Sequence, residues 1–169
     1  MASRAQVAVY PGTFDPITYG HIDIATRAAR VFEKVIVAIY DGGESASKKP
    51  LFSAEQRVAF ARQALCQSVN VSVDTFDNLL VDYCTAVGAG TIVRGLRAVS
   101  DFEYEFQLGH MYQHLDPGLE VVCLMTRSDH SFISSSIIRE VASLGGDIAN
   151  LVPPVVETAL RERFEQRGR

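Results

Sequence analysis

The chain has 169 residues, of which 47% are hydrophobic, and this is enough to bury one core without disulfides or metals. Its formal net charge of −4, without long blocks of one sign, argues against non-specific binding to nucleic acid or an anionic membrane. Three cysteines, Cys66, Cys84 and Cys123, form no C-x-x-C pair and lie in apolar stretches, so we expect buried, reduced thiols.

The N-terminal stretch MASRAQVAVYPG holds only a short apolar run. That run is shorter than the core of a signal peptide or a membrane-spanning helix. We therefore expect a cytoplasmic protein without a membrane partner.

Short β-branched runs alternate along the chain with segments whose apolar residues recur at helical spacing. This alternation is typical of βαβ crossovers and predicts an α/β fold, a doubly wound five-stranded parallel sheet with helices on both faces. The predicted strands are 6–10, 34–39, 69–76, 91–94 and 120–125, and the predicted helices are 22–31, 53–65, 101–115, 134–144 and 153–167.

Local signals mark several of these boundaries. Ser53 followed by Gln56 is a capping box that starts the second helix, and two glycines at 145–146 close the helix that begins near Ser134. No linker or repeat divides the chain, so we expect residues 1–169 to form one domain, with the helices from about 134 onward packed on it. Ligands of open parallel sheets bind beyond the carboxyl ends of the strands, where the polar loops 41–50 and 126–132 follow directly.

The exit from the first strand reads YPGTFDPITYGH at residues 10–21 and contains neither a P-loop nor a dinucleotide-binding fingerprint. Gly20 allows a polyphosphate to approach the backbone, and His21 in the first helical turn can donate to a phosphate oxygen. A lone histidine at a helix start is more often a capping or surface residue, but the neighbouring glycine favours a phosphate site here.

Three further segments carry groups suited to binding phosphate. Lys48 and Lys49 offer point charges in the loop after the second strand, although a solvated lysine pair is the plainer interpretation. Arg94 and Arg97, at the end of the fourth strand, can clamp phosphate oxygens, or they can instead pair with the acidic residues just downstream. The serines at 134–136 add hydroxyl donors at a helix N-terminus, where Ser134 could also be only an N-cap.

These motifs resemble those of a known family. The segment PGTFDP with Thr18, Gly20 and His21 resembles the T/H-x-G-H motif of the nucleotidylyltransferase superfamily, in the form typical of phosphopantetheine adenylyltransferases. The blocks RGLRAVSDFEYE at 94–105 and SFISSSIIR at 131–139 are similar to two further blocks of that family, in the same order. The chain differs from the usual pattern at Tyr19 and His130, and the stretch 41–46 is longer.

The resemblance implies transfer of an adenylyl group from ATP to 4′-phosphopantetheine, giving dephospho-coenzyme A and pyrophosphate. It implies a Rossmann-like fold, Mg²⁺ that enters with ATP and no side-chain metal ligands, a homohexamer, and inhibition by coenzyme A. It assigns catalysis to His21, Lys48 and Arg94, and phosphopantetheine binding to Thr13, Lys48, Leu80 and Arg94. It assigns ATP binding to Thr13, Phe14, His21, Gly95, Leu96, Arg97, Glu105, His130, Ser131, Phe132, Ile133, Ser134, Ser135 and Ser136.

The phosphate of the acceptor is largely dianionic at neutral pH, because its second pKa is near ~6, so the expected chemistry needs no general base. Two alternatives remain at this point. One is another nucleotidylyltransferase, acting on glycerol phosphate with CTP or on nicotinate mononucleotide, which the 94–105 block disfavours. The other is a non-catalytic flavodoxin-like module that binds a nucleotide without turnover.

Overall fold

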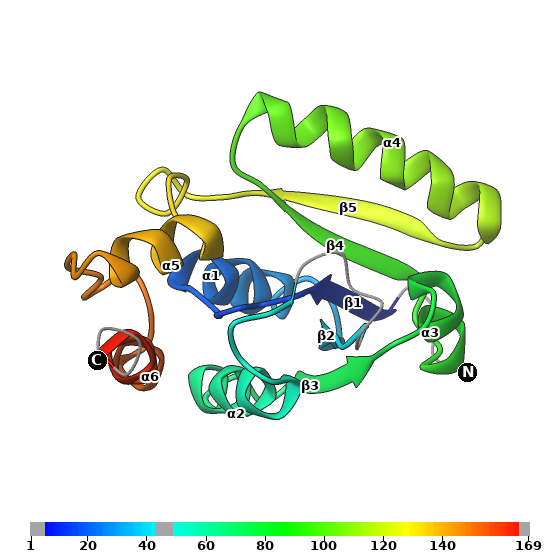
Figure 1. Cartoon of the computed structure of the whole chain (residues 1–169). Coiled ribbons are helices and arrows are strands. Elements are labelled where there is room, and N and C mark those ends of the chain that lie inside the picture. Colours follow the sequence, from blue (N-terminus) through cyan, green and yellow to red (C-terminus); the bar gives the residue numbers. More distant parts are fainter. Residues whose placement is uncertain (1–5, 43–48, 166–169) are drawn as a thin grey trace.

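The computed structural model describes residues 6–42 and 49–165. Within them a five-stranded parallel sheet has the order β3-β2-β1-β4-β5 (Figure 1). The strands are β1 (Val7–Gly12), β2 (Lys34–Tyr40), β3 (Val71–Phe76), β4 (Thr91–Leu96) and β5 (Glu120–Met125). The helices are α1 (Tyr19–Ala28), α2 (Ala54–Ala64), α3 (Leu80–Ala86), α4 (Val99–Leu115), α5 (Ser135–Ser143) and α6 (Pro154–Glu165). The predicted doubly wound α/β class is confirmed.

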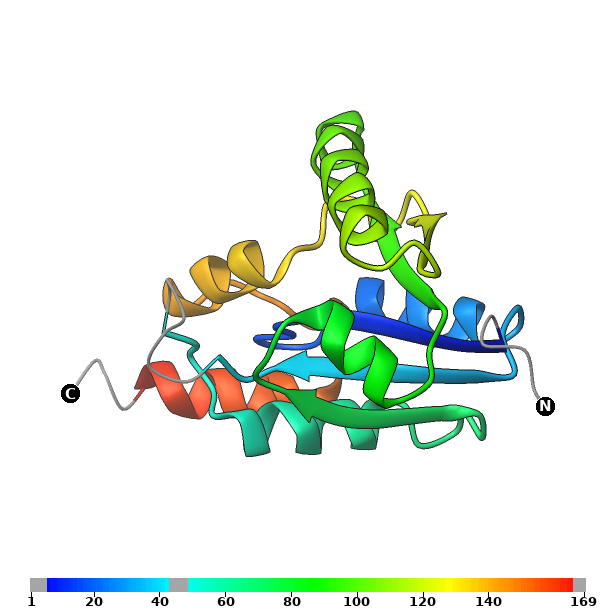
Figure 2. The same ribbon diagram turned by 90° about the vertical axis from the view of Figure 1, so that its right-hand side faces the viewer.

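Two apolar clusters cover the two faces of the sheet. On one face, side chains of α1, α2, α5 and α6 pack against alternate residues of β1 and β2, among them Ala8 and Val35. On the other face, α3 and neighbouring segments pack against the intervening residues, among them Val9 and Ile36. This alternation follows from the two-residue period of a strand buried on both sides. Figure 2 shows α3 and α2 on opposite sides of the β1–β2–β3 part of the sheet.

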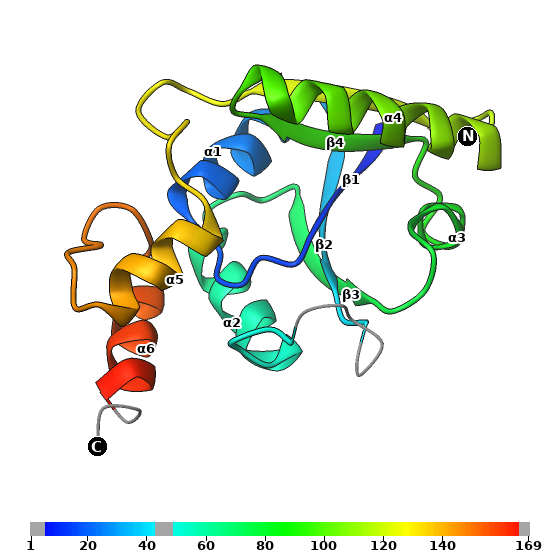
Figure 3. The same ribbon diagram turned by 45° about the horizontal axis from the view of Figure 1, so that its top comes forward.

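The junction between β1 and β4 is the narrowest in the sheet. These strands pair only at Ala8 with Thr91 and at Val9 with Ile92, whereas β1 pairs with β2 over its full length. Beyond these two pairs, β4 and β5 turn away from β1 and β2 (Figure 3). The strand order also reverses at this junction, so the chain leaves β1 and β4 in opposite directions and opens a crevice at their carboxyl ends.

The predicted boundaries hold to within a few residues, with one informative shift. α1 begins at Tyr19 and not at residue 22, because Thr18 acts as its N-cap. The capping box of Ser53 and Gln56 is present as predicted at the start of α2.

The prediction of three buried thiols is wrong for two of them. Cys84 is buried, but Cys66 and Cys123 are exposed. Cys66 lies in the turn after α2, and Cys123 lies on β5, which has no neighbouring strand on its outer side. Among the described helices, none is both long and apolar enough to cross a membrane.

Candidate active site

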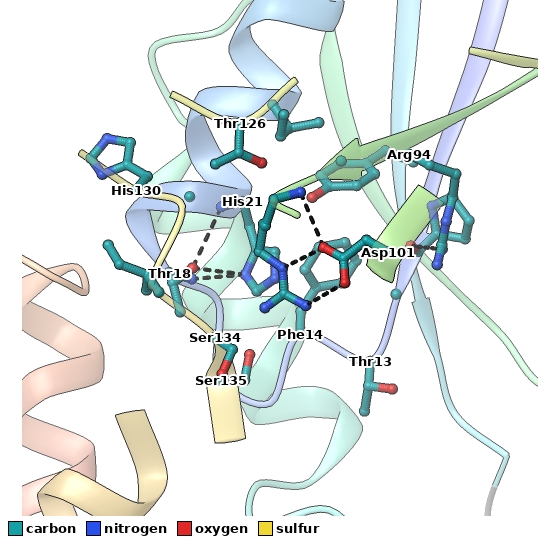
Figure 4. Close-up of a pocket in the computed structure, with 18 of the residues that line it drawn as sticks. Thr13, Phe14, Thr18, His21, Arg94, Asp101, Thr126, His130, Ser134 and Ser135 are labelled. Atoms are coloured by element: carbon teal, nitrogen blue, oxygen red, sulfur yellow. Dashed lines mark hydrogen bonds and ion pairs between the residues drawn. The ribbon is translucent and has the colours of Figure 1, made fainter. Parts of the chain in front are cut away.

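A cavity of about 380 Å³ lies at the carboxyl ends of β1 and β4, where the strand order reverses. Its walls come from the exit of β1, the first turn of α1, the end of β4, the start of α4 and the loop that leads into α5. Figure 4 shows His21 near the middle of this cavity, with Asp101 on one side and Thr18 on the other. The sheet topology therefore brings together side chains from segments far apart in sequence.

The capping of α1 fixes the ring of His21. The backbone N–H of Thr18 donates to His21 Nδ1 over 3.1 Å, and the hydroxyl of Thr18 lies 3.1 Å from the same nitrogen. An N–H donor facing Nδ1 requires that nitrogen to accept, so the ring proton of neutral His21 resides on Nε2. Phe14 packs its ring at right angles to the imidazole, with centroids 5.1 Å apart. The imidazole is thus held as an Nε2–H donor in the cavity wall.

The local environment also keeps His21 uncharged. Burial lowers the pKa of His21 to about 4, and the positive charge of Arg97 adds to this effect. Both causes disfavour the imidazolium form. At neutral pH the side chain is therefore a neutral hydrogen-bond donor.

Phe14 occupies an unusual backbone conformation. Its φ is 47°, in the left-handed region that bulky residues seldom adopt, and its side chain is 4% exposed. The buried ring rests on Gly12, where an added Cβ would lie 3.0 Å from ring atoms of Phe14. Such strain persists only where surrounding contacts enforce it, and it is common at ligand sites.

Two arginines at the end of β4 are each held by a carboxylate of α4. Arg94 donates to both oxygens of Glu105 over 2.7 Å and to the carbonyl of Pro11 over 3.1 Å. Arg97 pairs with Asp101 at 3.1 Å. Burial alone would lower the pKa of Arg94, but hydrogen bonds and charge from Glu105 outweigh it and raise that pKa. The carboxylates therefore orient both guanidinium groups before any ligand arrives.

The sequence left open whether these arginines face a phosphate site or pair with acidic residues downstream. Both arginines do form such ion pairs, and both also line the cavity. Burial opposes ionisation of Asp101, but hydrogen bonds from Arg97 hold its pKa below the ordinary value. A bound polyphosphate would compete with Asp101 for Arg97.

The N-terminus of α5 forms the opposite wall. Ser134 is its N-cap and accepts from the N–H of Ile137 over 3.2 Å, so the capping interpretation is also correct. Ser135 donates its hydroxyl proton to the carbonyl of Pro16 over 2.8 Å. This bond joins the wall to residues 13–18 between β1 and α1, which we call the β1 loop. The start of α5 directs backbone N–H groups and a partial positive charge at the cavity.

A buried polar network under the β1 loop has no clear signal in the sequence. Asp15 accepts from the N–H groups of Leu51 and Phe52 over 2.8 and 3.0 Å, and Arg139 bonds to both its carboxylate and its carbonyl. Arg57, only 1% exposed, donates to carbonyls of the same region. Sequence reasoning missed Asp15 and Arg57, because their partners lie far away along the chain. It also missed the tautomer-setting role of Thr18, for which the helical capping pattern with His21 at the third position was an available signal.

The structure brings together most of the residues predicted for ATP and acceptor binding. Those lining the cavity are Thr13, Phe14, His21, Arg94, Gly95, Arg97, Glu105, His130, Ile133, Ser134, Ser135 and Ser136. Leu80, Leu96, Ser131 and Phe132 do not line it. Lys48 lies outside the described residues.

The described part of the chain forms no group of three or more His, Cys, Asp or Glu side chains that could hold a metal ion. The two carboxylates that line the cavity, Asp101 and Glu105, are both engaged by arginines. The cavity thus offers cations and hydrogen-bond donors, a set suited to a polyphosphate anion.

Residues 9–141 match the cytidylyltransferase-like family. The chain is 62% identical to a phosphopantetheine adenylyltransferase of Thermomicrobium roseum, over 93% of this chain and 94% of that protein. It is 54% identical to one of Xylella fastidiosa, over 94% and 96%, and 48% identical to one of Geobacter sulfurreducens, over 94% and 95%.

The fold is similar to a solved structure from Vibrio parahaemolyticus that is assigned as a nicotinate-nucleotide adenylyltransferase. The TM-score is 0.67, the sequence identity is 18%, and the match covers 94% of this chain and 93% of the other. This likeness supports the fold alone. Identity near or above one half over almost the full length shows that the chain belongs to the phosphopantetheine adenylyltransferase family.

Proposed function

We propose that this chain transfers the adenylyl group of ATP to 4′-phosphopantetheine, giving dephospho-coenzyme A and pyrophosphate. The observation that carries the proposal is a single cavity that holds a neutral His21 donor, Arg94, Arg97 and the N-terminus of α5. This cavity belongs to a chain that is 62% identical to a protein named for that reaction.

The reaction forms a bond between an acceptor phosphate oxygen and the α-phosphorus of ATP, and it breaks the bond from that phosphorus to the β-bridging oxygen. The acceptor dianion supplies the electron pair, and pyrophosphate leaves with the electrons of the broken bond. His21 cannot be the base, because Nε2 carries the proton and Nδ1 already accepts from Thr18. Catalysis then consists of positioning and of stabilising negative charge.

Each polar group has a proposed role in this step. The Nε2–H of His21 donates to the α-phosphate as charge builds there. Arg97 and the serines of the α5 N-terminus bind the β- and γ-phosphates. Arg94, fixed by Glu105, binds the acceptor phosphate together with Lys48. Thr13 lies between the two substrates, and Leu80 lies beside the pantetheine arm.

We further propose that Mg²⁺ reaches the site on the ATP phosphates. The described residues offer no protein cage for a metal, and both cavity carboxylates are paired with arginines. Mg²⁺ retains several waters and commonly binds through substrate phosphates. When bound, it would neutralise charge on the polyphosphate.

The decisive experiment measures pyrophosphate release by the purified protein with Mg-ATP, with and without 4′-phosphopantetheine. Nicotinate mononucleotide with ATP, and glycerol phosphate with CTP, serve as control substrates. Release that requires 4′-phosphopantetheine is expected. Release with a control acceptor only would assign another nucleotidylyltransferase, and binding of ATP without release under any condition would leave a binding module.

A homohexamer is proposed as the working assembly. In support, α4 and β5 carry exposed large apolar side chains, including Phe102, Phe106, Met111, Leu115 and Met125. An apolar surface of this kind on one helix and the neighbouring edge strand is suited to packing against copies of itself. Light scattering should give six times the mass of one chain, and Phe106→Asp should reduce it. A monomeric wild-type protein would contradict the proposal.

Coenzyme A is proposed as a feedback inhibitor of this cytoplasmic enzyme, because it contains the whole of the product dephospho-coenzyme A. It should therefore occupy the cavity in competition with the substrates. Initial rates measured against increasing coenzyme A test this, and rates that stay constant would exclude it.

A further inference from the structure

Asp23 lies in the second turn of α1, and the reaction outlined above gives it no task. Its side chain is only 10% exposed, and it does not line the cavity, although His21 and Ile24 of the same helix do. A carboxylate that is largely removed from water is costly unless it is paired. The partners of Asp23 therefore indicate what this residue holds in place.

Two arginines bind the two oxygens of this carboxylate. Nη1 of Arg27, one turn further along α1, donates to Oδ2 of Asp23 over 2.9 Å. Nε of Arg127 lies 3.3 Å from Oδ1. Arg127 belongs to residues 126–133, which connect β5 to the N-cap of α5 and which we call the 126–133 segment. Asp23 thus joins α1 to a part of the chain that lies far away in sequence.

Arg27 provides a second link to the same segment. Its Nη1 also donates to the carbonyl of Met125 over 2.7 Å, and Met125 ends β5 just before the segment begins. Asp23 therefore restrains the segment directly through Arg127 and restrains its start through Arg27. Because Arg127 is 59% exposed, its ion pair adds little to stability, and its main effect is on the position of the segment.

The 126–133 segment forms part of the cavity wall. Thr126, His130 and Ile133 line the cavity, and Figure 4 shows the first two. The N–H of His130 donates to the carbonyl of Arg127 over 3.0 Å, and the N–H of Ile133 donates to the carbonyl of His130 over 3.1 Å. These backbone bonds couple the position of Arg127 to that of the lining residues.

We infer that Asp23 is a positioning residue for ATP, which acts through Arg127 and Arg27. It sets the 126–133 segment against α1, the helix that carries His21. The inference rests on the proposed function, because that proposal assigns this wall of the cavity to ATP. His130 and Ile133 are assigned to ATP alone and not to the acceptor.

The contacts of Asp23 also separate the two substrates. Among the described residues, those assigned to the acceptor are Thr13, Leu80 and Arg94, and neither ion pair of Asp23 involves any of them. Loss of the carboxylate should therefore weaken the binding of ATP and leave the binding of 4′-phosphopantetheine nearly unchanged.

The test compares Asp23→Ala and Arg127→Ala, singly and together, with Glu157→Ala and Arg161→Ala. Glu157 and Arg161 are the matched control, an ion pair of 2.6 Å on α6 whose arginine is 61% exposed, against 59% for Arg127. Neither control residue lines the cavity. For each protein the measured constants are kcat, KM for both substrates and Kd for a non-hydrolysable ATP analogue.

The expected result is a selective loss of ATP affinity. Arg127→Ala should raise KM for ATP and Kd for the analogue about fivefold, the upper range for a partly exposed ion pair, with kcat and the other KM within about twofold of wild type. Asp23→Ala should raise them at least as much, because it releases both arginines. The double variant should equal Asp23→Ala, since Arg127 then has no partner to lose. The control variants should match wild type.

Unchanged ATP constants in a folded Asp23→Ala enzyme would overturn the inference, as would an equal loss for both substrates or additive effects in the double variant. If Asp23→Ala does not fold, Arg127→Ala decides by the same constants, because it removes only an exposed side chain.

Failure of the proposed function has a different signature. A wild-type protein that binds the ATP analogue but releases no pyrophosphate would overturn the reaction, and the Kd values of the same variants would still decide the role of Asp23. A wild-type protein that does not bind the analogue would overturn both.

Discussion

His21 has one ring nitrogen engaged by the backbone of its own helix cap and the other assigned to the cavity. Because Thr18 N–H donates to Nδ1, the proton on Nε2 does not depend on the arrival of substrate. A preorganised donor of this kind stabilises developing charge without reorganising during the reaction. In the proposed mechanism this residue acts as a fixed hydrogen-bond donor and transfers no proton.

Removing that donor should lower kcat and leave the other properties of the protein nearly unchanged. His21→Ala should lower kcat by about 10² to 10³, by analogy with the loss of one oxyanion donor. Pyrophosphate release under saturating substrates measures it, with His114→Ala as control, since His114 is exposed near the end of α4. Full activity in the His21 variant would remove this residue from the mechanism.

The low pKa of His21 predicts the direction in which the stability of the protein changes with pH. The folded pKa is about 4, against about 6.5 in the unfolded chain, so the unfolded state binds more protons between these values. The stabilising contribution is complete above pH 6.5 and is lost as the pH falls toward 4. The free energy of unfolding in urea should decrease over this window in wild type, and less so in His21→Gln. Equal slopes for the two proteins would contradict the assignment.

Ring nitrogen chemical shifts give an independent test of the same state. In the wild type at pH 7 the spectrum of His21 should be that of a neutral imidazole with its proton on Nε2. These shifts should stay constant from pH 8 to about 5.5, because the pKa lies more than a unit lower. A midpoint near 6.5 would show that burial and Arg97 do not control this residue.

At the scale of elements, two helices begin with the same capping device but serve different ends. Thr18 caps α1 with His21 at the third position, and Ser53 caps α2 with Gln56 at the third position. The reciprocal bonds satisfy orphan N–H groups in both cases. Only in α1 is the returning side chain also part of the cavity.

This pair permits a comparison with an internal control. Thr18→Ala and Ser53→Ala should each destabilise the protein by about 1 kcal/mol, the usual cost of a lost N-cap. Thr18→Ala should in addition lower kcat, because it removes one of the contacts that orient His21. Chemical denaturation and kinetics on both variants make the comparison. Equal kinetic constants in the two variants would assign Thr18 to helix stability alone.

The elements themselves were largely predictable, because their signals are local. A capping box, a β-branched run or a glycine after a helix acts within a few residues, and β5 was predicted with the bounds that it has. The end of β4 was placed two residues short, since Gly95 and Leu96 follow a charged Arg94 that is unusual inside a strand. The candidate cavity followed from motif order combined with the rule for parallel sheets.

The contacts that complete the site were not predictable, for a physical reason. Arg57 reads as one of several charged residues on a polar helix, and arginine is seldom fully buried. Its carbonyl partner at Thr13 is 44 residues away in the chain. Asp15 likewise accepts from the N–H groups of Leu51 and Phe52, which lie 36 and 37 residues away. Such pairs depend on tertiary geometry, of which one sequence carries no local trace.

At the scale of the whole molecule, the strands of the sheet are paired unevenly. β2 pairs with β1 and with β3 along the length of each strand, but β1 and β4 share only two residue pairs. The side chain of Arg94 reaches the carbonyl of Pro11 across the open end. The proposed ATP site includes residues from both sides of this gap.

Ligand binding should therefore protect the open end more than the rest of the sheet. A non-hydrolysable ATP analogue at 100 times its Kd should raise the free energy of unfolding by about 2.7 kcal/mol. Amide exchange should slow most at 10–12 and 94–97 and least in β2 and β3. Mass spectrometry of exchanged peptides measures this pattern. Uniform slowing across all five strands would indicate global stabilisation without a contribution from the gap.

The two residue pairs between β1 and β4 have a consequence for how the molecule deforms. The sheet consists of two ribbons joined near one end, and the cavity lies at the other end, where the ribbons diverge. A substrate bound there contacts both parts of the sheet, opposite the two residue pairs that join them. Binding affinity and the relative mobility of the two parts are therefore coupled. A substitution that weakens the pairing of β1 with β4 should lower the affinity for substrate, and bound substrate should reduce the mobility of β4 and β5 relative to β1 and β2.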